Sequence, residues 1–222
     1  MTALTSSPSR SDLLGDHLRD GRDEVTPGGR RASPLTRADI VDAALTHFAD
    51  RGFHGTSLKD VAHSLHIRPP SLYHHIESKA SLLAEIVLTT LDHVADDFET
   101  AVADTEDPID KIRRAVAAYA RRHATHPRET RVVNQESRHL EPGDYAVARL
   151  ARQDHEHRFR SIISHGVATG AFDVDCPRLA SFAIREMCVS IARWFRPDGE
   201  LTPSDVADLY SRQAVALLRV PR

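Results

Sequence analysis

The sequence predicts an all-α protein, and three observations lead to this prediction. Apolar residues recur at helical spacing along most of the chain, as in the stripe Ile40, Ala44, Phe48. Gly and Pro residues punctuate these segments at intervals that suit helix ends. No segment is convincing as a β-strand. We expect an N-terminal arm over residues 1–34, a compact head over 35–80 and a helical body over 81–222.

Composition places the chain among ordinary globular proteins. The 222 residues are 41% hydrophobic and 27% charged, with a formal net charge of −3. No window approaches eighteen uninterrupted apolar residues, and the N-terminus lacks the apolar core of a signal peptide. We therefore expect a cytoplasmic protein without a membrane-spanning helix. The two cysteines, Cys176 and Cys188, suggest no disulfide framework.

The first 34 residues are rich in Ser, Gly, Pro, Asp and Arg. Such a composition buries too little apolar surface to offset the entropy of ordering, so we expect a disordered or frayed arm. This arm is either a solvated tail without a role or a minor-groove contact made by Arg30 and Arg31.

The head begins with a helix predicted from about Thr36 to Asp50. Thr36 is a suitable N-cap with Asp39 three residues later, and Gly52 is a suitable stop because glycine adopts positive φ. A second helix follows, which Ser57 caps together with Asp60.

A tight turn at His66-Ile67-Arg68 leads into a third predicted helix over 69–76. Proline is tolerated in a first helical turn, so Pro69 and Pro70 are placed to open it. Leu72 and Ile76 face inward and leave Tyr73 exposed. Two short helices joined by a three-residue turn form a helix-turn-helix pattern, although many all-α proteins contain corners of this shape.

Five longer helices are predicted in the body, with one shorter helix among them. The breaks between them are Pro108, Pro127, the Glu141-Pro142-Gly143 step, Gly170 and the turn at 196–199. The expected ranges are 78–103, 109–126, 128–140, 144–169, 178–195 and a last helix from the cap at 202–205 to about 218.

Residues 36–83 resemble the N-terminal domain of the TetR-type repressor family. The resemblance rests on a combination of short motifs: Ile40, Ala43, Ala44, Phe48, Arg51-Gly52-Phe53, Gly55-Thr56-Ser57, Asp60-Val61-Ala62, Leu72-Tyr73-His74-His75 and Ser78-Lys79.

The resemblance implies that the third helix lies in the major groove of DNA. It implies phosphate contacts by Tyr73, His74 and Lys79, with further hydroxyl or backbone contacts from Thr56 and Ser57. Base-edge contacts confer sequence choice, and the candidates for them are Arg68, Pro69, Pro70 and Ser71. At Arg68 and Pro70 this sequence departs from the residues common in the family, so the operator is least predictable there.

Metal binding and catalysis are both weaker interpretations of the sequence. Fourteen histidines are present, but pairs such as His155 and His157 point to different helix faces, and zinc usually needs three or four converging ligands. No phosphate-binding glycine loop, nucleophile elbow or HExxH motif occurs. We expect no metal, no cofactor and no enzymatic activity.

The helix near Arg185 carries the candidate ligand site. It is either a buried helix with one polar face or the wall of a pocket in which arginine meets an anionic ligand and Trp194 packs an apolar part. The segments 134–140, 149–170 and 185–199 are similar to the bodies of TetR-type regulators that sense acyl-coenzyme A thioesters, including steroid-degradation repressors. The candidate ligand-binding residues are Arg138, His139, Arg185, Met187, Arg193 and Trp194.

We therefore expect a ligand-responsive DNA-binding regulator, most simply a repressor that a small molecule releases from an inverted-repeat operator. A helical small-molecule-binding or interaction protein without specific DNA binding is the alternative. The family implies a homodimer. Its seam is expected along the helix near 144–170 and the last two helices, whose apolar residues lie in the seam or the core: Ile184, Ile191, Val206, Leu209, Val215 and Leu217.

Overall fold

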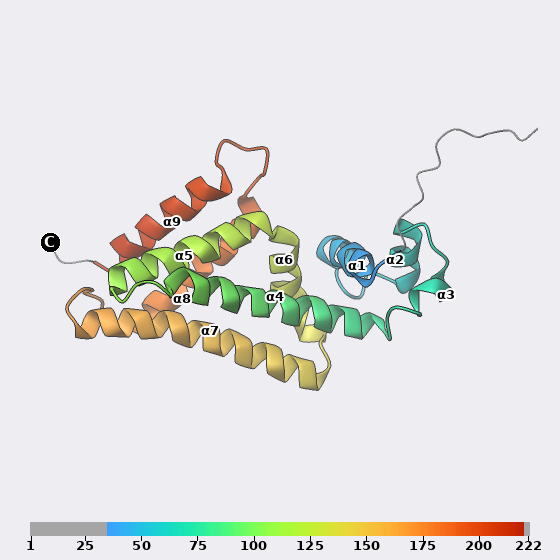
Figure 1. Cartoon of the computed structure of the whole chain (residues 1–222), viewed down its shortest axis with the longest axis horizontal. Helices are drawn as coiled ribbons and strands as arrows, with labels where there is room; N and C mark the ends of the chain where they lie inside the picture. The colour runs from blue at the N-terminus through green and yellow to red at the C-terminus, as the bar shows by residue number, and fades with distance from the viewer. Residues whose placement is uncertain (1–34, 220–222) are drawn as a thin grey trace, which may run out of the picture. The chain divides into compact units, whose positions relative to one another are not determined.

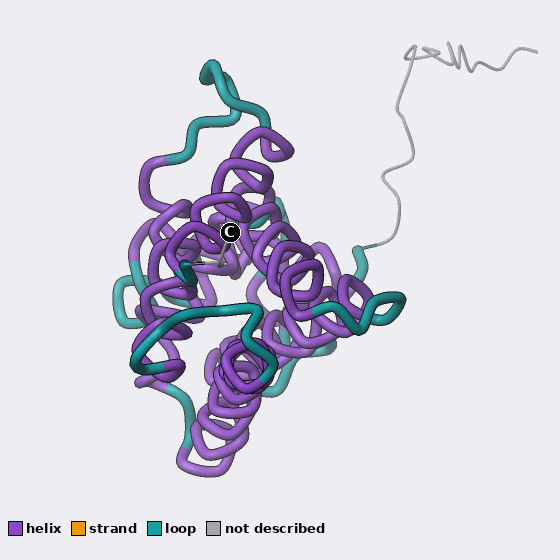
Figure 2. The backbone as a smooth tube through the Cα atoms, turned by 90° about the vertical axis from the view of Figure 1, so that its left-hand side faces the viewer, coloured by secondary structure: helices purple, strands orange, loops and turns teal. Residues whose placement is uncertain are grey.

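A computed structural model describes residues 35–219, and all regular structure in this part is helical (Figure 2). The predicted all-α fold is confirmed. The arm over 1–34, with Arg30 and Arg31, lies outside the described residues. The helices are α1 (Arg37–Arg51), α2 (Leu58–Ser64), α3 (Pro69–Leu72), α4 (Lys79–Val102), α5 (Pro108–Thr125), α6 (Pro127–Glu136), the 3₁₀ helix η1 (Ser137–His139), α7 (Pro142–Ala168), α8 (Pro177–Trp194) and α9 (Pro203–Leu217).

The head helices begin and end where their caps predict. Thr36 accepts a hydrogen bond from the backbone of Asp39, whose carboxylate bonds back to Thr36, and Ser57 does the same with Asp60. These capping boxes satisfy amides that have no partner inside the helix. Gly52 ends α1 with φ of 74°, a conformation that costs glycine little.

The third helix is shorter than predicted, because α3 ends at Leu72 and the chain continues as a turn through His75. The guanidinium of Arg37 donates to the carbonyl of His75, and the side chain of Ile76 is buried in the head. Both contacts draw the chain toward α1 and away from a continued helical path. In the turn before α3, His66 adopts φ of 56°, a left-handed conformation uncommon outside glycine.

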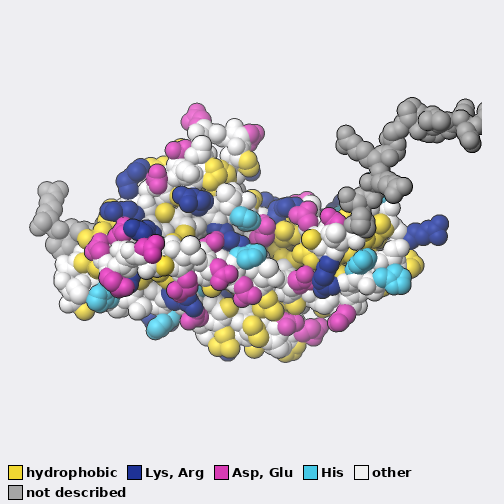
Figure 3. Space-filling model, viewed as in Figure 1, with side chains coloured by type: hydrophobic (Ala, Val, Ile, Leu, Met, Phe, Trp, Pro, Cys, Tyr) yellow, Lys and Arg dark blue, Asp and Glu magenta, His cyan; other side chains and the backbone are white. Residues whose placement is uncertain are grey.

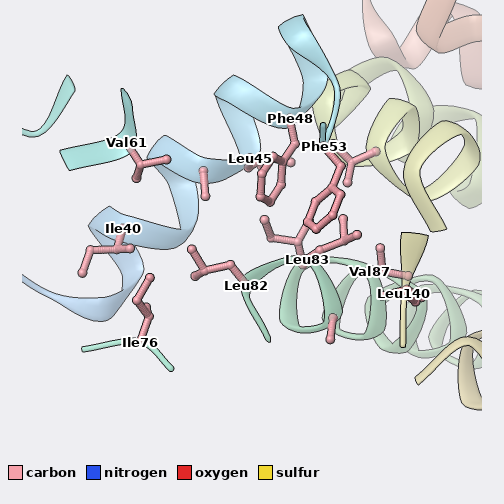
Figure 4. Packing of buried hydrophobic residues seen from close by; sticks show 14 of the residues in the cluster. Ile40, Leu45, Phe48, Phe53, Val61, Ile76, Leu82, Leu83, Val87 and Leu140 are labelled. Atoms are coloured by element: carbon pink, nitrogen blue, oxygen red, sulfur yellow. The ribbon is translucent and has the colours of Figure 1, made fainter. Parts of the chain in front are cut away.

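The head and the first half of α4 share one hydrophobic core. Figure 4 shows Phe48 and Phe53 between α1 and α4, with their ring centroids 5.6 Å apart and Leu83 below them. Residues of α6 and α7, including Val132 and Ala148, belong to the same cluster. The head therefore packs directly on the body, and a domain boundary at residue 80 remains a prediction.

A second core lies in the body. Helix α5 packs against α4, α7, α8 and α9, and α7 packs against α8 (Figure 1). The predicted helix at 128–140 is interrupted, since α6 ends at Glu136 and η1 follows. Ile184, Ile191 and Val206 are fully buried within the single chain, which places them in this core.

Candidate nucleic-acid interface and internal cavity

The surface around α3 exposes most of the residues that were predicted to contact DNA. Arg68, Pro70, Ser71 and His74 are exposed, Pro69 is partly exposed, and the side chain of Tyr73 is 57% exposed. Figure 3 shows Lys, Arg and His side chains projecting at this end of the molecule. A tyrosine with so little packing is available to an external partner.

Thr56 does not belong to this surface. It is 2% exposed, and its hydroxyl donates to the carbonyls of His47 and Gly52 at 3.1 and 3.0 Å. The hydroxyl already holds the end of α1, so a phosphate contact by Thr56, predicted through its hydroxyl or its backbone, stays a prediction that these bonds do not favour. The neighbouring Ser57 is exposed and forms the cap of α2.

Lys79 has a structural role in addition to the one that was predicted. Its ammonium donates to the carbonyls of Phe53 and Thr56 at 2.8 and 2.9 Å and lies 4.2 Å from the centroid of the Phe53 ring. An ammonium has three donors, so one N–H remains for a phosphate.

The body contains a partly open cavity of about 150 Å³, which we call the chamber. Five helices, α4 to α8, contribute to its wall. The apolar part comes from side chains such as Leu91, Val133 and Val189. The polar part is formed by Tyr119, Arg122, His123, His126, Glu129, Asn134, Arg152, His155, Arg185 and Glu186.

Burial keeps the two inner histidines of the chamber neutral. Desolvation, together with nearby arginines, lowers the pKa of His123 to about 4 and that of His155 to about 3. Desolvation also raises the pKa of Tyr119 to about 12, so its phenol keeps its proton. The formal charge of this inner wall is therefore carried by its arginines.

Two of the three arginines have an ion-pair, carbonyl or serine hydroxyl partner within the protein, and the third, Arg185, lies beside the phenol of Tyr119. Arg122 forms an ion pair with Asp97 at 2.7 Å. Arg152 donates to the hydroxyl of Ser137 at 2.7 Å and to the carbonyl of Val133. Burial lowers the pKa of Arg152. Its bonds tie the chamber wall in α7 to the C-terminal end of α6.

Arg185 has no carboxylate partner among the ion pairs of residues 35–219. Its Nε is buried and without a hydrogen-bond partner in the described structure, as are Nε2 of His155 and Nε of Arg122. Buried polar groups are normally satisfied, so three such atoms around one chamber indicate room for a polar guest.

Only one of the six predicted ligand residues, Arg185, lines the chamber. Arg138 and His139 belong to η1 at the contact with the head. Met187 packs against the second core. Arg193 is exposed, and Trp194 is 42% exposed and stacks on Tyr210 at 6.2 Å. Arg193 and Trp194, at the end of α8, are not among the residues that line the chamber, and a ligand contact by them stays a prediction.

Sequence reasoning missed most of the wall. Tyr119 and His123 are four residues apart on α5, and Arg152 and His155 are three apart on α7, so each pair lies on one helix face. Polar residues on the otherwise buried stripe of a helix were the available signal.

Helix α6 connects the chamber wall to the head at two points. From one side, Glu129, Thr130 and Val133 line the chamber. From the other side, Arg128 donates to the hydroxyl of Thr46 at 2.6 Å and to the carboxylate of Asp42 at 2.9 Å, both on α1.

The second point is a buried carboxylate at the end of α6. Glu136 is 7% exposed, and its Oε2 accepts a hydrogen bond from the backbone N–H of Phe53 at 2.9 Å. Next to it, His139 stacks on the Phe53 ring with centroids 5.7 Å apart and hydrogen-bonds to His54 at 3.1 Å. Desolvation and the neighbouring cations lower the pKa of His139.

An apolar surface remains uncovered along α7 and α8. Figure 3 shows hydrophobic side chains gathered over the α7 edge. An open groove of about 760 Å³ runs between the two helices, flanked by arginines. We call this surface the α7/α8 face and define it by the exposed residues Tyr145, Val147, Leu150, Leu179 and Phe182.

Within residues 35–219, no group of three or more His, Cys, Asp or Glu side chains is placed to hold a metal ion. None of the helices α1 to α9 combines the length and apolar character that a membrane span requires.

Two family models match this chain. The model of bacterial regulatory proteins of the tetR family covers residues 40–86, and that of the tetracyclin repressor-like C-terminal domain covers 105–218. A curated relative, the HTH-type transcriptional repressor KstR2 of Rhodococcus jostii, is 31% identical over 179 residues, which span 78% of this chain and 86% of the relative.

Solved structures agree with these matches. A bacterial regulatory protein in the tetR family from Rhodococcus RHA1 is 29% identical, with a TM-score of 0.76 over 84% of this chain and 98% of that one. AibR in complex with isovaleryl coenzyme A and operator DNA has the same fold, with a TM-score of 0.69 over 83% of this chain and 98% of that one, at 24% identity. KstR2 of Rhodococcus jostii is named as a transcriptional repressor and the Rhodococcus RHA1 protein as a regulatory protein.

Proposed function

The chain belongs to the TetR family of bacterial transcriptional regulators, and from this premise we propose that it is a cytoplasmic, homodimeric, non-enzymatic repressor that an acyl-coenzyme A thioester releases from an inverted-repeat operator. One observation supports the proposal most strongly. A surface suited to DNA at α3 is joined through α6 to the chamber in the body.

The proposed DNA contacts fall into two classes. Tyr73, His74, Ser57 and the third N–H of Lys79 bind phosphates and set the position of α3 in the major groove. The start of α3, with Arg68, Pro69, Pro70 and Ser71, reads base edges. Arginine can bond both acceptors of guanine, so Arg68 is the residue with the greatest expected effect on sequence choice.

The proposed dimer forms through the α7/α8 face. A contiguous apolar surface with a polar rim is typical of a protein interface. A second copy related by a twofold axis would bring Leu150 and Phe182 of the two chains together. The apolar residues Leu209 and Leu217 lie on α9, outside this face.

The proposed effector class rests on the size and chemistry of the chamber. AibR, which has the same fold, is known in complex with isovaleryl coenzyme A. A 150 Å³ chamber is comparable to an engineered protein cavity that holds benzene, so an acyl group of about that size fits while the nucleotide of coenzyme A does not. The nucleotide must therefore lie outside the chamber.

A second groove, of about 270 Å³, offers a path between the chamber and the head. It shares Thr90, Arg122, His126 and Glu129 with the chamber, and it reaches Val41 and Leu45 of α1. An effector that extends into this groove contacts the head helix itself.

Release of DNA is proposed to pass through α6. An acyl group that competes for Arg152 weakens its bonds to Val133 and Ser137, and the end of α6 then shifts together with Glu136. The shift changes the support of Phe53 and thereby the orientation of α3. A ligand achieves this only by binding the DNA-incompetent arrangement more tightly.

Binding to DNA is the first test of the proposal. We expect the dimer to shift a duplex from the region upstream of its own gene at moderate salt, and we expect an acyl-coenzyme A to weaken that complex. Absence of any specific complex would refute the repressor, whereas a specific complex that no thioester affects would refute only the effector class.

A further inference from the structure

One arginine of the chamber wall forms no ion pair within residues 35–219. This residue, Arg185, reaches the chamber from α8, and its Nε is buried. Removing a charge from water is expensive unless an opposite charge or good hydrogen bonds replace the solvent. The other two arginines of the wall have their partners in Asp97, Val133 and Ser137.

The groups around Arg185 are suited to accept a small anion. Tyr119 keeps its phenol proton, because desolvation raises its pKa to about 12, and it can donate a hydrogen bond. The unpartnered Nε2 of His155 can also donate when it carries the ring proton. A neutral imidazole adds no charge of its own.

The two glutamates of the chamber wall do not cancel the preference for an anion at the inner end of the chamber. Glu129 is partly exposed and Glu186 is exposed, whereas His155 is buried and Tyr119 is partly buried against the second core. The volume of about 150 Å³ limits the guest to the size of a single ring. A carboxylate fits this space and a nucleoside phosphate does not.

We propose that the effector carries a carboxylate on the group that enters the chamber, and that Arg185 binds it with Tyr119 and His155. This inference rests on the proposed function and narrows it, since the acyl part of the thioester would then end in a free acid. A planar carboxylate also matches the fork of donors on a guanidinium.

The test compares benzoate with benzamide, which match in size and differ in charge. We expect benzoate to bind the dimer about tenfold or more tightly than benzamide, because hydrogen bonds to charged groups are the strong ones. Binding can be measured by ligand-detected NMR, with the rise in Tm as a second reading. Equal affinity for the two, including no binding of either, would overturn the proposal.

Arginine variants distinguish binding of benzoate in the chamber from attraction by the overall charge of the protein. Arg185→Gln should abolish the preference for benzoate. Arg193→Gln should keep it, since it makes the same charge change on an exposed part of the same helix. Arg185→Lys keeps the charge and should retain part of the preference, which provides a reading if the glutamine variant does not fold. An identical loss in Arg185→Gln and Arg193→Gln would overturn the proposal.

Arg185 also borders the open groove beside the α7/α8 face, which suggests two competing roles. If Arg185→Gln converts the dimer into a monomer, the arginine serves the interface and the proposal fails. Free coenzyme A is the second control. If it raises the Tm as much as benzoate does, and only when Arg185 is present, the bound anion is a phosphate and the proposal fails. Operator binding without ligand is measured in wild type and in the exposed Arg193→Gln variant, so a failure of the carboxylate proposal is distinct from a failure to bind DNA.

Discussion

The carboxylate of Glu136 accepts a hydrogen bond from the backbone N–H of Phe53 at 2.9 Å, across 83 positions in the sequence. Glu136 ends the helix that lines the chamber, and Phe53 lies in the turn between the first two helices of the head. The bond is buried, so neither group is bonded to water in its place. It is a buried polar link between the two parts.

Loss of this acceptor should destabilise the protein. In Glu136→Ala the N–H of Phe53 stays buried without a partner, which costs about 1–3 kcal/mol. Glu136→Gln retains an oxygen acceptor and should cost much less. Urea unfolding of both variants tests this expectation, with the exposed Glu141→Ala as a control near the wild-type value. Equal stability of the alanine and glutamine variants would contradict it.

Tyr73→Phe should weaken operator binding without changing stability. The hydroxyl lies on a side chain that is 57% exposed, so its removal leaves the fold intact. A lost hydrogen bond to a charged phosphate corresponds to about a tenfold loss of affinity. Fluorescence anisotropy with labelled operator measures the effect, and Tyr210→Phe in α9 is the matched control. A wild-type affinity in Tyr73→Phe would remove this contact from the proposal.

Phe182→Glu should separate the dimer. A carboxylate at the centre of the α7/α8 face would be buried against the second copy without a partner, and that arrangement is costly. The molar mass from light scattering should fall to that of one chain, and operator affinity should fall with it. Leu201→Glu changes an equally exposed apolar residue in the loop before α9 and should remain dimeric. A dimeric Phe182→Glu variant would place the interface elsewhere.

Acid should destabilise the protein through the two buried histidines. The pKa values of His155 and His123 in the folded state are about 3 and about 4, below the ordinary value near 6.5, so the unfolded chain binds more protons between these limits. The contribution of the two neutral histidines to stability is therefore fully present above about pH 6.5 and is lost as the pH drops toward 4. The free energy of unfolding falls by about 1.4 kcal/mol per pH unit for each histidine that is protonated in the unfolded chain and neutral in the folded one.

His155→Phe should reduce this loss, because one of the two titrating groups is removed and the unpartnered Nε2 disappears with it. His157→Gln, an exposed change on the same helix, should keep the wild-type slope. Unfolding free energies measured between pH 4.5 and 7 decide the matter. Parallel curves for wild type and His155→Phe would show that this histidine titrates normally.

The parts of the fold that depend on local chemistry could be predicted from the sequence. The caps at Thr36 and Ser57 are formed by side chains three residues apart, and the stop at Gly52 needs only a positive φ. The exposed position of Tyr73 follows from the inward spacing of Leu72 and Ile76. The length of α3 could not be predicted, because it depends on the distant bond from Arg37 to the carbonyl of His75.

The chamber was largely hidden in the sequence because five helices build it. Arg152 and Arg185 meet only after α7 and α8 have packed, and no spacing within either helix reveals the meeting. Arg193 is exposed and Trp194 stacks on Tyr210, and neither lines the chamber with Arg185, so membership of one helix was a poor guide to the chamber wall. The hydroxyl bonds of Thr56 to carbonyls at the end of α1 were hidden for a similar reason, since they form only after the chain has folded back on that helix.

The central claim is that the chamber controls the head through α6. The test uses an acyl-coenzyme A that raises the Tm of the protein. The most direct measurement is the operator Kd with this thioester divided by the operator Kd without it, in wild type, Glu136→Gln and Glu136→Ala. The account predicts the same large ratio for the first two and a ratio near one for Glu136→Ala. An undiminished ratio in a folded, dimeric Glu136→Ala variant would contradict the claim.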